Sequence, residues 1–423
     1  MDNFLTHTFS IKNHPICELK NIFKVQYVMG LGEFMYHMSK KDGRARLVFE
    51  VWARSIVDSL PASYWQCTSD FSRIRKAISL KREGINFFTM RRAFFFDCFY
   101  LVSKLDAKLL KIAQAFLYAH VKDFIAKRVL NDVYNNWDKT TLNKIPSQLI
   151  LHKKTDEDFH NKHLKRILVV ATMSAGKSTL INALVGYRIN TVKATACTSK
   201  LCYLYNKPST DGIIVKCENG GYLYNYDVES PQKGEFVKAG LHFNSSLSDC
   251  RICFIDTPGT NYSGDQSHGE ITRKAIASND YDGLIFVSNA LYFNTEDERT
   301  LLDYTVSHTK KTIVFVLNQL DGFNPRHDSI KEIYDEFEAI LKAKRVRPLI
   351  VPLSGYYSLL LRIKHRKFDD VEREDFISLN KRFQKDFYRL PVYCKNSAMV
   401  KGNQNRELYK SGIIILENII KSI

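Results

Sequence analysis

A phosphate-binding loop lies in the middle of the sequence, between an apolar segment and a segment of helical character. The apolar run 167–170 leads into the loop ATMSAGKST at 171–179, and helical residues follow at 180–185. Strand, loop and helix in this order bind phosphates, because backbone N–H groups and the positive helix end face the anion. Ala171 stands where such loops usually have their first glycine. The alanine strains the backbone only if that position needs a positive φ.

Six consecutive residues of this loop are predicted to contact a nucleotide. Lys177 supplies a positive charge between the β- and γ-phosphates, and Ser178 places its hydroxyl on Mg²⁺. The predicted phosphate contacts are Ser174, Ala175, Gly176, Lys177, Ser178 and Thr179.

A second loop follows the apolar run 252–255, with the sequence Asp-Thr-Pro-Gly at 256–259. Asp256 is predicted to hold the coordination shell of the magnesium ion. The backbone N–H of Gly259 is predicted to contact the γ-phosphate. A strand that ends in such a turn is common by itself. Its position downstream of a phosphate loop favours the magnesium role.

A third loop follows the apolar run 313–317 and begins with Asn318. Asp321, three residues later, offers two acceptor oxygens that match the N1–H and 2-amino donors of guanine, which adenine lacks. Gln319 stands where lysine is usual, so we expect looser packing over the base and a modest affinity. Ser354 follows a final strand and is the predicted contact to the guanine oxygen.

The segment that closes over the γ-phosphate must lie between 186 and 201. Thr198 is the preferred magnesium ligand in it, and Thr195 is the alternative. Thr260 occupies the place where many small GTPases carry a water-orienting glutamine. His268 is a weaker candidate base. The predicted catalytic set is Lys177, Ser178, Thr198, Asp256 and Gly259, with Ser178, Thr198 and Asp256 as metal ligands.

The patterns predict an α/β fold preceded by an all-α region. Residues 1–160 show helical periodicity, including a run from 105 to 116, and are predicted to form a basic helical domain. Residues 161–423 alternate short apolar strands with helical stretches, which is typical of a mostly parallel sheet with helices on both faces. The polar stretch 153–158 is the predicted connector.

The loops and their surroundings resemble bacterial dynamin-like GTPases. The resemblance rests on 173–184, on 256–261 and on the closing motif 411–417, and it covers roughly 165–423. It implies low affinity for GTP and GDP, pairing of two G domains or of a partner dynamin-like chain, and work at an anionic membrane surface. Met173 departs from the family, because eukaryotic dynamins carry a catalytic glutamine there.

Charge and composition leave a second class open. The chain has a net charge of +17, and residues 1–150 hold 23 Lys plus Arg against 13 Asp plus Glu, which favours anionic partners. Basic and aromatic residues interleave within 73–100, as lipid or RNA binding would require. A GTPase of the Era and TrmE kind, acting in RNA or ribosome assembly, is the alternative. The start lacks a secretory signal, so we expect a cytoplasmic protein, peripheral at the inner face of a membrane, with reduced cysteines.

Overall fold

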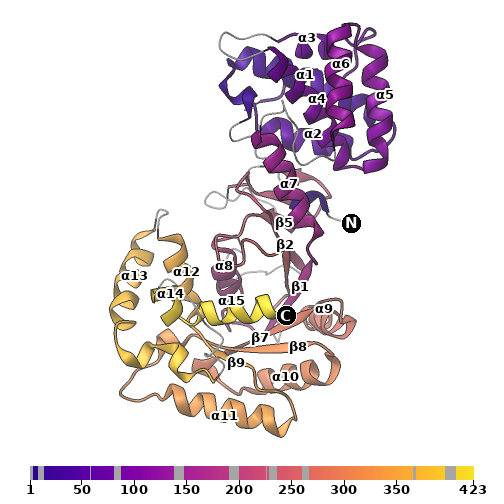
Figure 1. Cartoon of the computed structure of the whole chain (residues 1–423). Coiled ribbons are helices and arrows are strands. Elements are labelled where there is room, and N and C mark those ends of the chain that lie inside the picture. Colours follow the sequence, from indigo (N-terminus) through magenta and orange to yellow (C-terminus); the bar gives the residue numbers. More distant parts are fainter. Residues whose placement is uncertain are drawn as a thin grey trace. The chain divides into compact units, whose positions relative to one another are not determined.

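The chain divides into two compact units. The structure is a computed structural model, and it describes residues 3–7, 14–57, 59–80, 87–137, 147–189, 200–224, 226–227, 236–259, 266–364, 368–395 and 406–423. One unit holds Met1–Asn161 with Pro208–Asp211, and the other holds Lys162–Lys207 with Gly212–Ile423. The first is helical and the second is built on a sheet (Figure 1).

The helical unit is built around α4, which is apolar on all sides and buried along most of its length. A helix that is hydrophobic all round belongs in a core rather than at a surface. The described helices of this unit, with short 3₁₀ helices marked η, are η1 (Asn3–Thr6), η2 (Pro15–Glu18), α1 (Asn21–Met38), α2 (Ala45–Arg54), α3 (Ser72–Ile78), α4 (Phe87–Ser103), η3 (Ala107–Leu109), α5 (Leu110–His120), α6 (Phe124–Asn135) and α7 (Ser147–Asn161).

Part of the interleaved basic and aromatic stretch is buried, and this part cannot serve as an interaction surface. Phe94, Phe95 and Phe96 are at most 2% exposed. Arg91 is buried as well, and its guanidinium lies 2.8 Å from the carboxylate of Asp123 at the start of α6. These aromatic rings stabilise the core, and this arginine joins two helices, so none of these residues is available to lipid or RNA.

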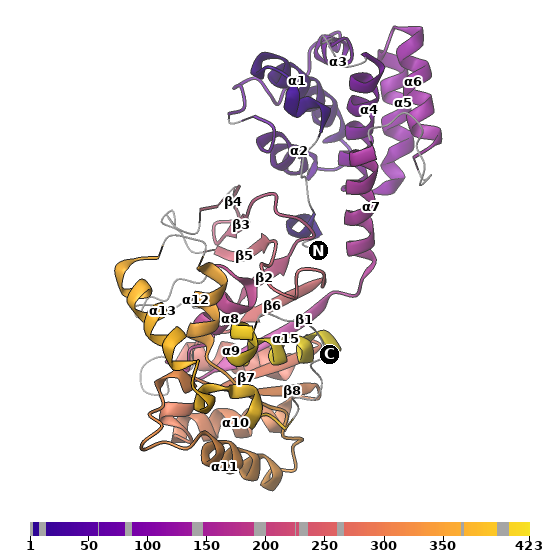
Figure 2. The same cartoon turned by 60° about the vertical axis from the view of Figure 1, so that its left-hand side comes forward.

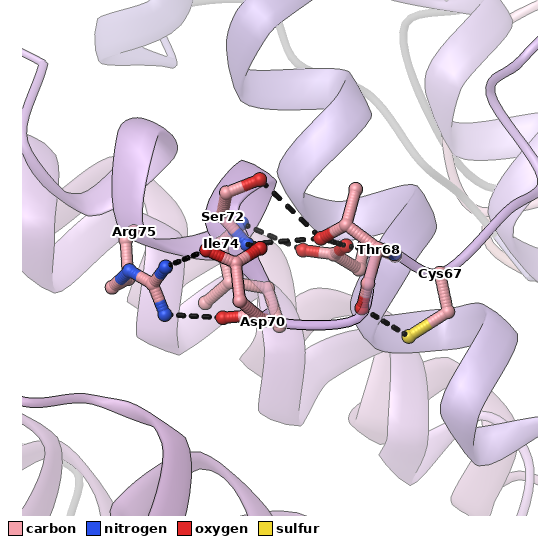
Figure 3. Close-up of polar contacts among 7 residues, drawn as sticks. Cys67, Thr68, Asp70, Ser72, Ile74 and Arg75 are labelled. Carbon is pink, nitrogen blue, oxygen red and sulfur yellow. Dashed lines mark hydrogen bonds and ion pairs between the residues drawn. The ribbon is translucent and has the colours of Figure 1, made fainter.

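A buried carboxylate joins α1 to the segment before α3. Glu33 accepts hydrogen bonds from the backbone N–H of Thr68 at 2.7 Å and from that of Ile74 at 3.0 Å. The hydroxyl of Thr68 donates to the same carboxylate and accepts from the N–H of Ser72 at 3.0 Å (Figure 3). Because orphan N–H groups at a helix start need acceptors, Glu33 and Thr68 together fix where α3 begins.

Two segments of the helical unit differ from the prediction. The polar stretch 153–158 lies inside α7 rather than in a connector, because Asp156 is buried and paired instead of solvated. The helical run predicted from 105 to 116 is broken before α5. The side chain of Asp106 accepts the N–H of Lys108 and caps η3, which ends one helix and starts the next.

Within the described residues, the second unit holds a nine-stranded sheet in the order β4-β3-β5-β2-β6-β1-β7-β8-β9. The strand pairs β1–β6, β1–β7, β7–β8, β8–β9 and β2–β5 are parallel, whereas β2–β6, β3–β5 and β3–β4 are antiparallel. The strands are β1 (Lys165–Ala171), β2 (Cys202–Asn206), β3 (Ile214–Cys217), β4 (Tyr222–Leu223), β5 (Phe236–Leu241), β6 (Ile252–Asp256), β7 (Gly283–Asn289), β8 (Thr312–Asn318) and β9 (Ile350–Pro352).

Helices cover both faces of this sheet, as predicted (Figures 1 and 2). Helix α8 packs with α12 and α15, and α9 packs with α10. The described helices are α8 (Lys177–Val185), α9 (Gln266–Ser278), η4 (Ala290–Tyr292), α10 (Glu296–His308), η5 (Leu320–Gly322), α11 (Ile330–Ala343), α12 (Gly355–Ile363), α13 (Asp370–Arg382), η6 (Asp386–Tyr388), η7 (Leu390–Tyr393), α14 (Arg406–Lys410) and α15 (Ile413–Ser422). In the described part of the chain, no helix has the length and apolar character that crossing a membrane requires.

The closing motif at 411–417 packs against the end of β9. Gly412 has φ +87°, and a Cβ there would lie 2.2 Å from the carbonyl oxygen of Pro352, so only glycine fits. The carbonyl of Ser411 accepts the backbone N–H of Ser354 at 3.0 Å. The C-terminal segment therefore holds the loop that begins α12.

Candidate nucleotide-binding site

The phosphate loop connects β1 to α8, as the sequence predicts. Ser174 and Gly176 have φ of +62° and +81°, whereas Ala171 ends β1 and is not among the described residues with positive φ. The alanine substitution is therefore tolerated without backbone strain. A Cβ on Gly176 would lie 2.5 Å from the Nδ2 atom of Asn318, so the glycine makes room for that amide. When left-handed residues alternate with others just before a helix, their backbone N–H groups point toward one place. This arrangement forms an anion-binding concavity.

Lys177 and Asp256 meet at the carboxyl ends of two adjacent parallel strands. Asp256 is the last residue of β6 and is in register with Val169 of β1. The ammonium of Lys177 forms an ion pair with Oδ1 of Asp256, and their side chains are only 9% and 12% exposed. Gly259 lies beside the loop, since a Cβ there would be 3.7 Å from the Cα of Met173. The structure thus brings the first two predicted loops together.

The residues around Asp256 suit Mg²⁺. Asp256 offers a carboxylate, and Ser178 offers a hydroxyl from the second residue of α8. Hard oxygen donors such as these are the ligands that Mg²⁺ prefers, and it is usually held by one or two protein groups together with nucleotide phosphates. The ion pair with Lys177 shows that the pocket already accommodates a cation against this carboxylate. The third predicted ligand, Thr198, lies outside the described residues, as do Thr195 and Thr260.

Asn318 joins the phosphate loop to the loop after β9. Its Nδ2 donates to the carbonyl of Ala175 at 2.9 Å, and its Oδ1 accepts the N–H of Gly355 at 2.9 Å. The side chain is 2% exposed. Because both partners are backbone groups of different loops, Asn318 sets the distance between the phosphate-binding and base-binding parts of the site.

Two amides that the sequence prediction did not assign to the phosphate loop also hold it. The Nε2 of Gln319 donates to the carbonyl of Ser174 at 2.7 Å, and the Nδ2 of Asn289 donates to the same oxygen at 3.3 Å. Gln319 was interpreted only as a loss of packing over the base. Asn289 was missed, although a polar residue at the carboxyl end of a parallel strand marks the usual ligand edge. Together the two amides stabilise the left-handed conformation of Ser174.

Asp321 and Ser354 form the predicted base-reading end of the site. The hydroxyl of Ser354 donates to Oδ1 of Asp321 at 2.5 Å, and Ser354 also caps α12 by accepting the N–H of Tyr357. Arg382 donates to the backbone carbonyl of Asp321 at 3.0 Å. Burial raises the pKa of Asp321 above its ordinary value, and the bond from Ser354 opposes this shift. Asp321 is thus a shielded acceptor beside Ser354.

The side chain of His268 lies outside the described part of the chain.

Replacing Asn318 by alanine is expected to destabilise the sheet unit by about 2 to 6 kcal/mol. It removes two buried hydrogen bonds and leaves a carbonyl and an N–H unsatisfied, each at about 1–3 kcal/mol. Urea unfolding of the full chain measures the effect. Asn324→Ala, in the exposed part of the same loop, serves as the matched control. It removes one exposed hydrogen bond, from the N–H of Arg326 at 3.1 Å, and should cost no more than about 0.5–1.5 kcal/mol. Equal stability of the two variants would contradict the bridging role.

Comparisons with known proteins give one family match and several remote structural neighbours. Residues 166–319 match the family described as 50S ribosome-binding GTPase. Era from Aquifex aeolicus bound to GDP·AlF4− is 17% identical over 52% of this chain and 57% of that one, with a TM-score of 0.30. The G domain of the FeoB iron transporter of T. maritima is 17% identical over 52% of this chain and 99% of that domain, with a TM-score of 0.24. A bacterial selenocysteine-specific elongation factor is 15% identical over 51% of this chain and 29% of that one, with a TM-score of 0.32.

These likenesses have limits. The chain spans little more than half of the Era protein, and similarity at these TM-scores supports no inference about partners. No curated protein matches the chain. None of these structures is a dynamin, so the dynamin-like interpretation stays a prediction. The family match over 166–319 confirms the predicted fold class, a P-loop G domain.

Proposed function

We propose that this chain, which contains a P-loop GTPase domain, uses the site described above to bind GTP with Mg²⁺ and to hydrolyse it. The observation that carries the proposal is the bridge through Asn318, which joins the phosphate loop to the loop that begins with Ser354. One side chain thereby holds the predicted triphosphate and guanine ends at a fixed separation.

Each residue has a role that follows from its chemistry and place. The ammonium of Lys177 exchanges the carboxylate of Asp256 for the β- and γ-phosphate oxygens, because both are anionic and the phosphates carry more charge. The N–H groups between Ser174 and Thr179 bind the remaining oxygens at the start of α8. Ser178 and Asp256 hold Mg²⁺, which when bound neutralises charge on the phosphates. Gly259 places its backbone N–H toward the γ-phosphate.

Residue 260 is a threonine, so no glutamine stands at that position to orient the attacking water. We propose that the site is completed from outside the isolated domain, by pairing with a second copy or with a partner chain, as the dynamin-like resemblance implies. Thr198 would complete the magnesium shell in that assembly. Specific activity should then rise with protein concentration. Constant specific activity over a hundredfold range, with no response to a partner, would favour a monomeric switch.

Hydrolysis assays on the full chain test the proposal. Release of phosphate from GTP should require Mg²⁺ and stop when a chelator is added, because the phosphate charge is then no longer neutralised. Restoring Mg²⁺ should restore the rate. If turnover persists with the chelator present, the roles assigned to Ser178 and Asp256 are wrong.

A ribosomal or RNA role is the second candidate, and the family match favours it. The matched family is described as 50S ribosome-binding, and the net charge of +17 suits an anionic partner of either kind. Co-sedimentation with 50S subunits and, separately, with anionic liposomes distinguishes the two. If the chain binds the 50S subunit with an affinity that falls steeply with salt, and does not bind the liposomes, the membrane interpretation is wrong.

A further inference from the structure

Two histidines and an aspartate gather in the helical unit, and none of them belongs to the nucleotide site described above. Asp156 and His160 lie four residues apart on one face of α7, and His7 follows η1. Asp156 is 1% exposed, whereas the side chains of His7 and His160 are 12% and 13% exposed. The cluster is therefore shielded but still within reach of a small ion.

The spacing of the donor atoms is that of a metal site. Nδ1 of His7 lies 3.2 Å from Oδ2 of Asp156, and Nδ1 of His160 lies 3.4 Å from the same oxygen. Each of the three residues offers one ligand atom, and all three atoms lie within 4.8 Å of one another. Tetrahedral zinc with bonds of about 2.0–2.1 Å places neighbouring ligand atoms about 3.3 Å apart. The two measured separations agree with that value.

The surrounding contacts supply the support that a metal-bound histidine needs. Nε2 of His160 lies 2.9 Å from the hydroxyl oxygen of Thr6. Nδ1 of His160 also lies 2.7 Å from the backbone carbonyl oxygen of Asp156, which only accepts, so without a metal Nδ1 carries the proton and Nε2 accepts from the hydroxyl of Thr6. Ligation of a cation through Nδ1 would move that proton to Nε2, which would then donate to Thr6. A hydrogen bond on the second ring nitrogen is the usual means by which proteins orient a ligating histidine.

Lys104 is the competitor for this site. Its ammonium forms an ion pair with Oδ2 of Asp156, and together with the histidine contacts it outweighs the effect of burial and holds the pKa of Asp156 well below its ordinary value. The same ammonium lies 4.2 Å from the ring centroid of Tyr100. A cation entering the cluster can therefore displace Lys104 while its ammonium keeps a favourable position over that ring.

We propose that His7, Asp156 and His160 bind a divalent cation of the zinc type, with water as the fourth ligand. Two imidazoles and one carboxylate are a donor set that suits Zn²⁺, and three protein ligands leave one position open. Bound metal would join the N-terminal segment at η1 to α7. The proposed site uses none of the residues assigned to the nucleotide or to Mg²⁺.

Cobalt titration of the metal-free full chain, without nucleotide, tests the proposal. Tetrahedral Co²⁺ absorbs visible light strongly, and Zn²⁺ added afterwards should remove the band. His7→Ala and His160→Ala should each weaken binding by about 100-fold or more, and Thr6→Val by about 10-fold, the range seen for groups that orient ligands. Lys104→Met should strengthen binding, because it removes the competing ammonium and leaves Asp156 without its positive partner.

The control is His163→Ala, which removes an exposed histidine of the other unit and should leave the titration unchanged. Circular dichroism confirms that each variant keeps its helices. Unfolding cannot explain a gain of affinity, so Lys104→Met decides the outcome if a histidine variant is unstable. Absence of the band in both the natural chain and Lys104→Met, or an undiminished band in both histidine variants, would overturn the proposal.

Discussion

Replacing Lys177 by alanine is expected to lower the rate of GTP hydrolysis by about 10²–10³-fold, the effect of removing one preorganised group that stabilises developing charge. Lys177 is the buried ammonium of the site, paired with Asp256 at the end of β6. Without it, the phosphates lose a positive charge and Asp256 loses its partner. Phosphate release at saturating GTP measures the effect on the chemical step, and nucleotide titration separates it from weaker binding.

The matched control is Lys274→Ala, which removes an exposed lysine of α9 that pairs with its helical neighbour Glu270. Its turnover should equal that of the natural chain, because exposed pairs at this spacing contribute only about 0.3–0.5 kcal/mol to stability. Thermal unfolding checks that Lys177→Ala remains folded. Undiminished turnover in that variant would remove the phosphate-binding role from the loop.

Replacing Asp321 by asparagine is expected to change the preferred base from guanine to xanthine. The substitution exchanges an acceptor for a donor opposite the 2-position of the base. Sites that bind polar groups through buried partners reject a mismatched analogue by about 10⁴-fold. Ser354 can still donate to the remaining oxygen of residue 321, so the loop should keep its shape. Competition between GTP and xanthosine triphosphate measures the change.

Asp370→Asn is the control for this substitution, since Asp370 is 94% exposed at the start of α13. It should leave the preference for GTP untouched. If Asp321→Asn binds GTP as tightly as the natural chain, guanine recognition does not depend on this carboxylate.

The placement of the three predicted loops could be foreseen because each follows an apolar strand. Runs such as 167–170 and 313–317 are buried on both faces of a mostly parallel sheet, so their strands appear as continuous apolar segments. Parallel strands end at one edge, which places the loops side by side. The sequence could not show that Ser174 adopts a left-handed conformation. That conformation depends on amides from Asn289 and Gln319, which lie more than a hundred residues away.

The helical unit was harder to predict, because composition does not reveal which face of a helix is buried. The basic and aromatic stretch within 73–100 has the composition of an interface, yet Phe94–Phe96 form the core and Arg91 is paired inside it. The stretch 153–158 has the composition of a linker, yet Asp156 is buried because Lys104 and two histidines surround it. In both cases a partner distant in sequence offsets the cost of burying a charge.

The central claim is that this chain binds guanine nucleotides through the loops joined by Asn318, and calorimetric titration tests it most directly. Metal-loaded full chain is titrated separately with GTP, GDP and ATP. GTP and GDP should bind, and ATP should bind weaker by a factor on the order of 10⁴, because adenine leaves the acceptors of Asp321 unpaired. ATP binding as tight as GTP binding, or no heat with any of the three nucleotides, would contradict the account.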